Sequence, residues 1–111
     1  MLPPKNRIDK KLFPEFMKKA KTFSSENLNL KVVRDCPKGR AFAFVASLKV
    51  SKKAAERNKL KRRARAVTYP LLKDIHPGLC AAVFFKPSII GKKYAAIKDE
   101  LTSLYKKAKI V

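Results

Sequence analysis

Apolar residues along the chain predict three strands and indicate a fourth. Alternation over residues 28–33 predicts a half-buried strand, and a nearly continuous apolar run over residues 41–48 predicts a strand in the middle of the sheet. Residues 35–39 between them have turn composition, so we expect these two strands to form a hairpin. A shorter strand is expected at residues 21–24, and residues 79–86 predict a last, buried strand.

Three other segments have the 3.6-residue period of a helix. They span residues 9–20, with Asp9 as the N-cap, residues 54–69 and residues 92–108. Pro14 is tolerated only near the first turn of a helix, so the first of the three is short. The apolar stripes of the two later helices are Leu60, Ala64 and Val67 in one and Tyr94, Ile97, Leu101, Leu104 and Ala108 in the other. Each stripe predicts a helix that docks on a core by one face.

Helices and strands are interspersed along the chain, with strands over residues 21–48 and one strand–helix–strand unit around the helix at residues 54–69. This order predicts an α+β fold, a two-layer sandwich whose helices lie mainly on one face of the sheet. The 111 residues, 46% of them hydrophobic, fit a single domain over residues 1–111. Residues 1–8, with two prolines and two basic residues, are expected to form an extended basic arm.

The basic side chains indicate that this α+β domain binds a polyanion. The chain has 28 Lys and Arg against eight Asp and Glu, a formal net charge of +20. Nine of the basic residues fall in the 17 positions of residues 49–65, which contain one acid, Glu56. On the helix at residues 54–69, Arg57, Lys61 and Arg65 form one cationic edge beside the apolar stripe, and other cations lie nearer the opposite edge. We therefore expect this helix to be the working surface of a domain that binds a polyanion.

Several other classes of protein are not expected. No apolar run is long enough to cross a membrane, and the N-terminal residues lack the apolar core of a secretory signal, so the chain is expected to be cytoplasmic. Cys36 and Cys80 lack CxxC spacing and are expected to be reduced thiols, with a bridge between them as the alternative that a reducing compartment disfavours. With His76 as the single histidine, no protein zinc site is expected. The carboxylates are scattered, so no catalytic residue is expected in the protein itself.

Aromatic residues leave one question open, because each could stack on a base or pack in the core. Core packing is favoured for Phe16 and Tyr94, and the two alternatives are evenly balanced for Phe13. Composition alone fits a structural RNA- or DNA-binding protein, such as a small ribosomal or nucleoid component, as well as any other RNA-binding function.

One sequence motif separates these alternatives. Residues 56–63, ERNKLKRR, follow Ser47-Leu48-Lys49 and resemble the signature of the bacterial ribonuclease P protein subunit, an R-N-R-φ-K-R-φ-φ-R helix (φ apolar) after a strand that ends in S-K-K. Lys59 replaces the second arginine of the R-N-R triplet, which keeps the charge but loses the bidentate geometry of arginine. Leu48 replaces the first lysine of the strand-end pair, unless Ser51-Lys52-Lys53 is the true match. The matching motif positions are Arg57, Asn58, Leu60, Lys61, Arg62 and Arg65.

The resemblance extends over nearly the whole chain. Residues 5–8 resemble the basic N-terminal box of the family, residues 13–17 its F-x-x-φ-F helix, and residues 83–87 its late strand. The resemblance implies an αβββαβα sandwich with a left-handed crossover, an exception to the usual right-handed rule. It also implies 5′ maturation of precursor tRNA, in which the RNA subunit holds the catalytic metal ions and cuts the phosphodiester.

The resemblance also implies roles for individual residues. The positions that match contacts with the catalytic RNA are Lys49, Lys52, Lys53, Arg57, Asn58, Lys59 and Arg62, and those that match the cleft for the 5′ leader of precursor tRNA are Phe13, Met17, Lys31, Lys61 and Arg65. Met17 and Lys31 stand where many members have aromatics, which predicts weaker or differently placed leader stacking. No cofactor is expected on the protein alone, Mg²⁺ is expected in the RNA–protein holoenzyme, and the protein is expected to be monomeric apart from RNA.

Overall fold

The computed structural model describes residues 18–34, 41–75 and 78–110. The expected basic arm at residues 1–8 and most of the expected helix at residues 9–20 lie outside these ranges, and residues 18–19 are helical. Two candidates for base stacking, Phe13 and Phe16, and the predicted leader-cleft residue Met17 also lie outside the described residues.

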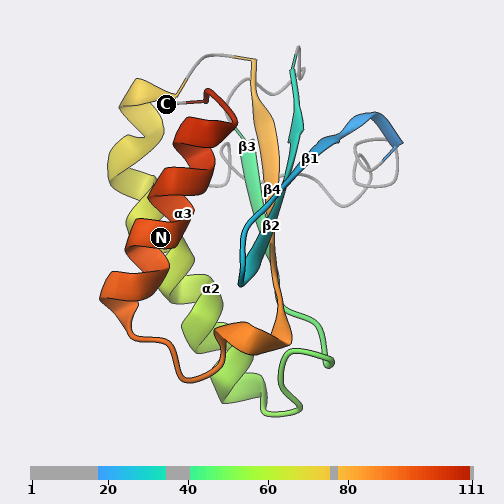
Figure 1. The fold of residues 1–111 in the computed structure, drawn as a ribbon, viewed down its shortest axis with the longest axis vertical. Coiled ribbons are helices and arrows are strands. Elements are labelled where there is room, and N and C mark those ends of the chain that lie inside the picture. The colour runs from blue at the N-terminus through green and yellow to red at the C-terminus, as the bar shows by residue number, and fades with distance from the viewer. Residues whose placement is uncertain (1–17, 35–40, 76–77, 111) are drawn as a thin grey trace.

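Four strands form one mixed sheet in the order β1-β2-β4-β3. The strands span Lys21–Ser24 (β1), Leu28–Val33 (β2), Ala41–Val45 (β3) and Cys80–Phe85 (β4). β1 pairs with β2, and β2 with β4, in antiparallel fashion, whereas β3 and β4 are parallel. Figure 1 shows the sheet with its two long helices on the same side. The predicted two-layer α+β fold is confirmed.

The position of β3 differs from the sequence prediction. β3 forms no hairpin with β2 and lies at the edge of the sheet, because β4 is inserted between the two strands. Val83 of β4 is opposite Leu30 on one side and Phe44 on the other. Burial explains the difference: every residue of β4 except Phe84 is buried, whereas two of the five residues of β3 are only half-buried. The apolar run of β3 therefore reflects a strand covered well on one face, and β4, with β2, is an inner strand of the sheet.

The two predicted helices begin and end within two residues of their expected bounds. They are α2, Ala54–Thr68, and α3, Tyr94–Lys107. α2 continues without a break into a 3₁₀ helix, η2, Tyr69–Asp74. Pro70 lies in the first turn of η2, where a residue without a backbone N–H is tolerated. A short 3₁₀ turn, η3, Pro87–Ile89, joins β4 to α3.

The connection from β3 through α2 to β4 has the unusual hand that the family resemblance implies. β3 and β4 are parallel neighbours, so α2 must carry the chain back along the sheet. In Figure 1 the chain runs down β3, up α2 and down β4. It turns clockwise as it comes towards the viewer, since β3 lies behind β4. That rotation is a left-handed crossover.

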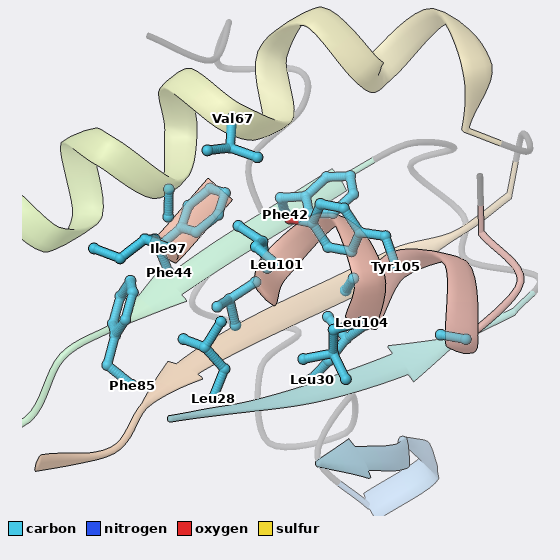
Figure 2. Close-up of a cluster of buried hydrophobic side chains, with 14 of the residues drawn as sticks. Leu28, Leu30, Phe42, Phe44, Val67, Phe85, Ile97, Leu101, Leu104 and Tyr105 are labelled. Carbon is cyan, nitrogen blue, oxygen red and sulfur yellow. The ribbon is translucent and has the colours of Figure 1, made fainter. Parts of the chain in front are cut away.

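One large apolar core lies between the sheet and the helices, as Figure 2 shows. It includes Leu28 and Leu30 of β2, Phe42 and Phe44 of β3, Val83 and Phe85 of β4, Leu60, Ala64 and Val67 of α2, and Ile97, Leu101 and Leu104 of α3. The predicted stripe of α2 is confirmed in full, and that of α3 from Ile97 to Ala108. Core packing of Tyr94 is wrong, since this side chain is 39% exposed. The first three residues of α3 are all exposed, so the helix meets the core only at Ile97.

A buried polar contact joins the two helices. The Tyr105 hydroxyl lies 2.6 Å from Thr68 Oγ1, and Thr68 Oγ1 also donates to the Ala64 carbonyl at 2.8 Å. The Tyr105 ring meets the Phe42 ring edge-on, with the ring centroids 5.9 Å apart. Burial raises the pKa of Tyr105 far above its ordinary value, more than the hydrogen bond to Thr68 lowers it. This contact fixes the position of α3 against α2 and the sheet.

A carboxylate of α3 holds the turn between β1 and β2. Glu100 Oε2 accepts hydrogen bonds from Ser25 Oγ and, at 2.8 Å, from the Asn27 backbone N–H, and Oε1 accepts from Asn27 Nδ2 at 2.7 Å. Partial burial acts to raise the pKa of Glu100, but these hydrogen bonds and the charge of Lys86 more than offset it. The pKa therefore lies below its ordinary value. The carboxylate is thus held in its charged form.

Cys80 differs from its predicted free thiol, because it is joined in a disulfide. It is the first residue of β4 and lies between Val33 of β2 and Ala41 of β3 in the register of the sheet. The end of β2 and the start of β3 therefore both lie beside Cys80. The predicted β2–β3 hairpin would not have placed Cys80 between these two strands. Cys36 and His76 lie outside the described residues.

Candidate nucleic-acid interface

The loop that leads from β3 into α2 presents the first cations of the predicted surface. A turn closes this loop, since the Val50 N–H donates to the Ser47 carbonyl at 3.0 Å and the Val50 side chain is buried. Leu48, at the tip of the turn, is 67% exposed. Ser47-Leu48-Lys49 begins two residues after the end of β3, whereas Ser51-Lys52-Lys53 leads into the helix. This placement favours the first triplet as the strand-end motif. The lysines Lys49, Lys52 and Lys53 are all exposed.

Hydrogen bonds tie this loop to the first turn of α2. Arg57 Nη1 donates to the Ser51 carbonyl at 2.8 Å, and Ser51 Oγ donates to Glu56 Oε1. Ser51 Oγ also accepts the Lys53 N–H at 3.1 Å, which satisfies one of the amide groups left open at the helix start. Arg57 is therefore half-buried and held in place before any partner binds, while its other guanidinium N–H groups stay available for a phosphate.

One edge of α2 lies over the edge of the sheet. Arg57, Lys61 and Arg65 are all half-buried and flank the buried residues Leu60 and Ala64. The Arg65 guanidinium carbon lies 6.0 Å from the centroid of the Phe44 ring, a cation–π distance that places Arg65 over β3. This side of the helix therefore offers a row of three cations, each partly packed against the protein and partly exposed.

The other edge of α2 lies near a different loop. Arg63 is half-buried, and its Nη1 donates at 3.4 Å to the carbonyl of Lys92, which precedes α3. Lys59 on this side is exposed, as are Asn58 and Arg62 on the outward face. The cations of one helix are thus divided between two sides.

Lys31 lies on the opposite face of the sheet from the helices. Its Nζ donates to Thr22 Oγ1 at 3.1 Å and lies 5.9 Å from the centroid of Phe84, which is half-buried. The residues that the sequence predicts for the leader cleft therefore lie on two sides of the sheet, with Lys61 and Arg65 on α2 and Lys31 on the far face. The structure does not bring Lys31 into the same cluster as the other two.

Phe84 is a candidate contact residue that the sequence did not single out. It is the one residue of β4 that is not buried, and it carries an aromatic ring beside a lysine. The apolar run of β4 lacks alternation, so the sequence did not distinguish its two faces. Only the strand's position between β2 and β3 identifies Phe84 as belonging to the face away from the helices.

Two kinds of site can be checked over the part of the chain that the structure describes. No three His, Cys, Asp or Glu side chains lie together there in a way that could hold a metal ion. No helix within those residues is long and apolar enough to cross a membrane.

Comparison with known proteins identifies the family. The model of the Ribonuclease P family matches residues 2–109. The ribonuclease P protein component of Microcystis aeruginosa is 40% identical over 77 residues, which cover 69% of this chain and 64% of that protein. The corresponding protein of Pseudanabaena sp. is 31% identical over 113 residues, which cover 100% of this chain and 97% of that protein.

A solved structure shows the same fold. The RNase P protein of Staphylococcus aureus superposes with a TM-score of 0.84 at 20% identity, and the match covers 95% of this chain and 96% of that one. The likeness extends over the mixed sheet and both helices. With the family match over nearly the whole chain, the conclusion is that this chain belongs to the ribonuclease P protein family.

Proposed function

We propose that this chain is the noncatalytic protein subunit of ribonuclease P and promotes endonucleolytic 5′ maturation of precursor tRNA. In this role the protein binds the catalytic RNA of the holoenzyme, and the RNA subunit cleaves the phosphodiester. The observation that carries the proposal is the cationic surface of α2, in which Arg57 is held by the Ser51 carbonyl within the sequence ERNKLKRR.

The chemistry of this surface suits phosphate groups. Arg57, Asn58, Lys59 and Arg62, with Lys49, Lys52 and Lys53 of the preceding loop, supply charge-assisted donors on one end of the molecule. Fixing Arg57 before binding reduces the side-chain entropy that a contact would otherwise cost. If roughly six phosphates are neutralised, release of counterions predicts an affinity loss of about 10³-fold between about 50 and 200 mM salt.

The 5′ leader of precursor tRNA is the second proposed ligand. Lys61 and Arg65 would meet it on α2, and Lys31 beside the Phe84 ring would meet it on the far face of the sheet. Phe13 and Met17, which match the family's leader cleft, lie outside the described residues. An aromatic ring beside a cation suits a single strand, because every base has a face that can stack.

Mg²⁺ belongs to the holoenzyme in this proposal. The described residues provide no cluster of carboxylate, histidine or cysteine ligands that fits a metal ion. In this proposal the RNA subunit holds the metal ions, and no step is assigned to protein-bound metal. The protein is further proposed to be cytoplasmic and monomeric apart from RNA.

Reconstitution with RNA tests this function directly. The full chain is mixed with a bacterial ribonuclease P RNA and a labelled precursor tRNA at a magnesium concentration too low for the RNA alone. We expect the protein to restore cleavage at the mature 5′ end. No restored cleavage, together with duplex DNA bound as tightly as this RNA at physiological salt, would instead support a structural RNA- or DNA-binding protein.

A further inference from the structure

A second cationic site lies away from α2, at the opposite edge of the sheet. A cavity of about 320 Å³ opens between β1, the end of β2 and the C-terminal end of α3. Its described lining consists of Lys19, Lys21, Phe23, Val32, Arg34, Lys107, Ala108 and Lys109. We propose that this cavity, here called the β1–α3 pocket, binds the phosphates of a single-stranded RNA segment distinct from the RNA held by α2.

The floor of the β1–α3 pocket is apolar and its rim is cationic. Val32 and Ala108 are buried, and Phe23 is half-buried against the core. The five basic residues of the lining are all exposed, and none of the described lining residues is acidic. Lys21 Nζ lies 5.7 Å from the centroid of the Phe23 ring. A cationic groove with an aromatic floor is the combination that binds single-stranded nucleic acid.

Like charges gathered in this way disfavour folding unless an anion neutralises them. Arg34 Nη2 donates at 3.2 Å to the Ala108 carbonyl at the negative end of α3, which partly balances the charge of Arg34. A carbonyl dipole balances only part of the charge of one guanidinium, and Lys21, Lys107 and Lys109 add further positive charge to the rim. The site is therefore suited to a ligand that carries several negative charges.

The backbone at Lys109 has a conformation that usually favours glycine. Lys109 has φ of 59°, in the left-handed region where glycine is preferred after a helix. The following Ile110 N–H bonds back to the Tyr105 carbonyl at 3.1 Å and closes the helix end in the usual way. A lysine thus stands where glycine would be less strained, and its side chain lines the pocket.

The position of the pocket separates it from the α2 surface. β1 is one edge strand of the sheet and β3, under Arg65, is the other. Three strand spacings of about 4.8 Å put these edges roughly 14 Å apart, with α3 packed against β1 and β2. The α2 surface and the β1–α3 pocket are therefore separate surfaces at opposite edges of the sheet. The inference rests on the proposed function for the identity of that RNA, and the pocket itself stands on its lining.

A matched pair of triple variants tests the proposal in the full-length protein. The pocket variant is Lys21→Gln/Lys107→Gln/Lys109→Gly, and the control variant, Lys73→Gln/Lys98→Gln/Lys106→Gln, removes the same charge from exposed lysines outside the described lining. The probe is an unstructured oligouridine titrated at several salt concentrations. Loss of three phosphate contacts should lower the slope of log K against log salt by about 2 in the pocket variant and by much less in the control. Equal slopes in the two variants would overturn the proposal.

Lys109→Gly alone separates binding from folding. Glycine relieves the left-handed strain, so we expect a higher midpoint of thermal unfolding together with weaker oligouridine binding. A fall in both would show that Lys109 acts through stability. A site for a free phosphate ion is tested by comparing thermal unfolding in phosphate and in chloride at equal ionic strength. If phosphate stabilises the unaltered protein more than the pocket variant, and the pocket variant binds oligouridine as tightly as the unaltered protein does, the pocket is a small-anion site. That result would refute the RNA site.

Failure of this inference can be told apart from failure of the proposed function. If the pocket variant matches the control in oligouridine binding while both restore cleavage of precursor tRNA, only the β1–α3 pocket is refuted. If the unaltered protein restores no cleavage, the proposed function fails, whatever the pocket binds.

Discussion

Arg57 Nη1 donates a 2.8 Å hydrogen bond to the carbonyl of Ser51, so the first arginine of the α2 surface also holds the loop from which the helix starts. Arg57 therefore has a structural role in the loop as well as a proposed role in RNA contact. Changes at Arg57 therefore have two consequences, and a second variant is needed to separate them.

Arg57→Ala should weaken binding of ribonuclease P RNA and lower the slope of its salt dependence by about 1, because one phosphate contact is lost. Filter binding at several salt concentrations measures both. Ser51→Ala is the control, since it removes the hydroxyl bonds to Glu56 and to the Lys53 N–H but keeps the carbonyl that Arg57 uses. An unchanged slope in Arg57→Ala would show that this arginine serves the loop alone.

Lys61→Ala/Arg65→Ala should reduce cleavage of precursor tRNA at low magnesium and leave binding of the RNA subunit less affected. The physical reason is the position of the pair beside β3, away from the loop lysines. Single-turnover cleavage with substrates of long and very short leader gives the readout. The loss should appear with the long leader and be nearly absent with the short one. Normal cleavage of both substrates would remove these residues from the leader site.

Leu60→Asp should unfold the domain. Leu60 is 5% exposed, and a carboxylate there would be buried without a partner, a change that costs on the order of several kcal/mol. Circular dichroism during urea titration measures the loss. Lys59→Asp is the matched control, because Lys59 precedes Leu60 in α2 and its side chain is exposed to solvent. If Leu60→Asp were as stable as the control, the buried face of α2 would be wrongly assigned.

The stabilising contribution of Glu100 should be lost in acid. Because its folded pKa lies below the ordinary value of 4.5, its contribution to stability is present above that value and is lost as the pH falls through the folded pKa. Glu100→Gln should be less stable at neutral pH and should show a flatter decline in unfolding free energy below about pH 5. Urea titrations at several pH values compare the two. Parallel curves for both proteins would contradict this role.

Helical periodicity made α2 and α3 predictable. In α2, for example, Leu60, Ala64 and Val67 recur at a spacing that fits a helix with one buried face. Strand order was different. An apolar run records burial but not the identity of the neighbouring strand, and the parallel pairing of β3 with β4 depends on a left-handed crossover that no residue spacing encodes. The disulfide of Cys80 was missed for the same reason, since it depends on which strand ends meet.

The site was predictable to the same limited extent. Four-residue spacing placed Arg57, Lys61 and Arg65 on one edge of α2. The carbonyl that holds Arg57 and the half-exposed face of Phe84 depend on tertiary contacts. The β1–α3 pocket joins lysines and an arginine from both ends of the chain, so only the folded structure brings them together.

The central place of β4 has a consequence for biosynthesis. β4 is the strand that links the β1–β2 pair to β3, yet it follows α2 in the chain. During translation the whole basic helix leaves the ribosome before the sheet can close, so early nascent chains carry an exposed cationic helix without its finished support. Folding must therefore wait for residues beyond Phe85, and the long-range parallel pairing should set its rate.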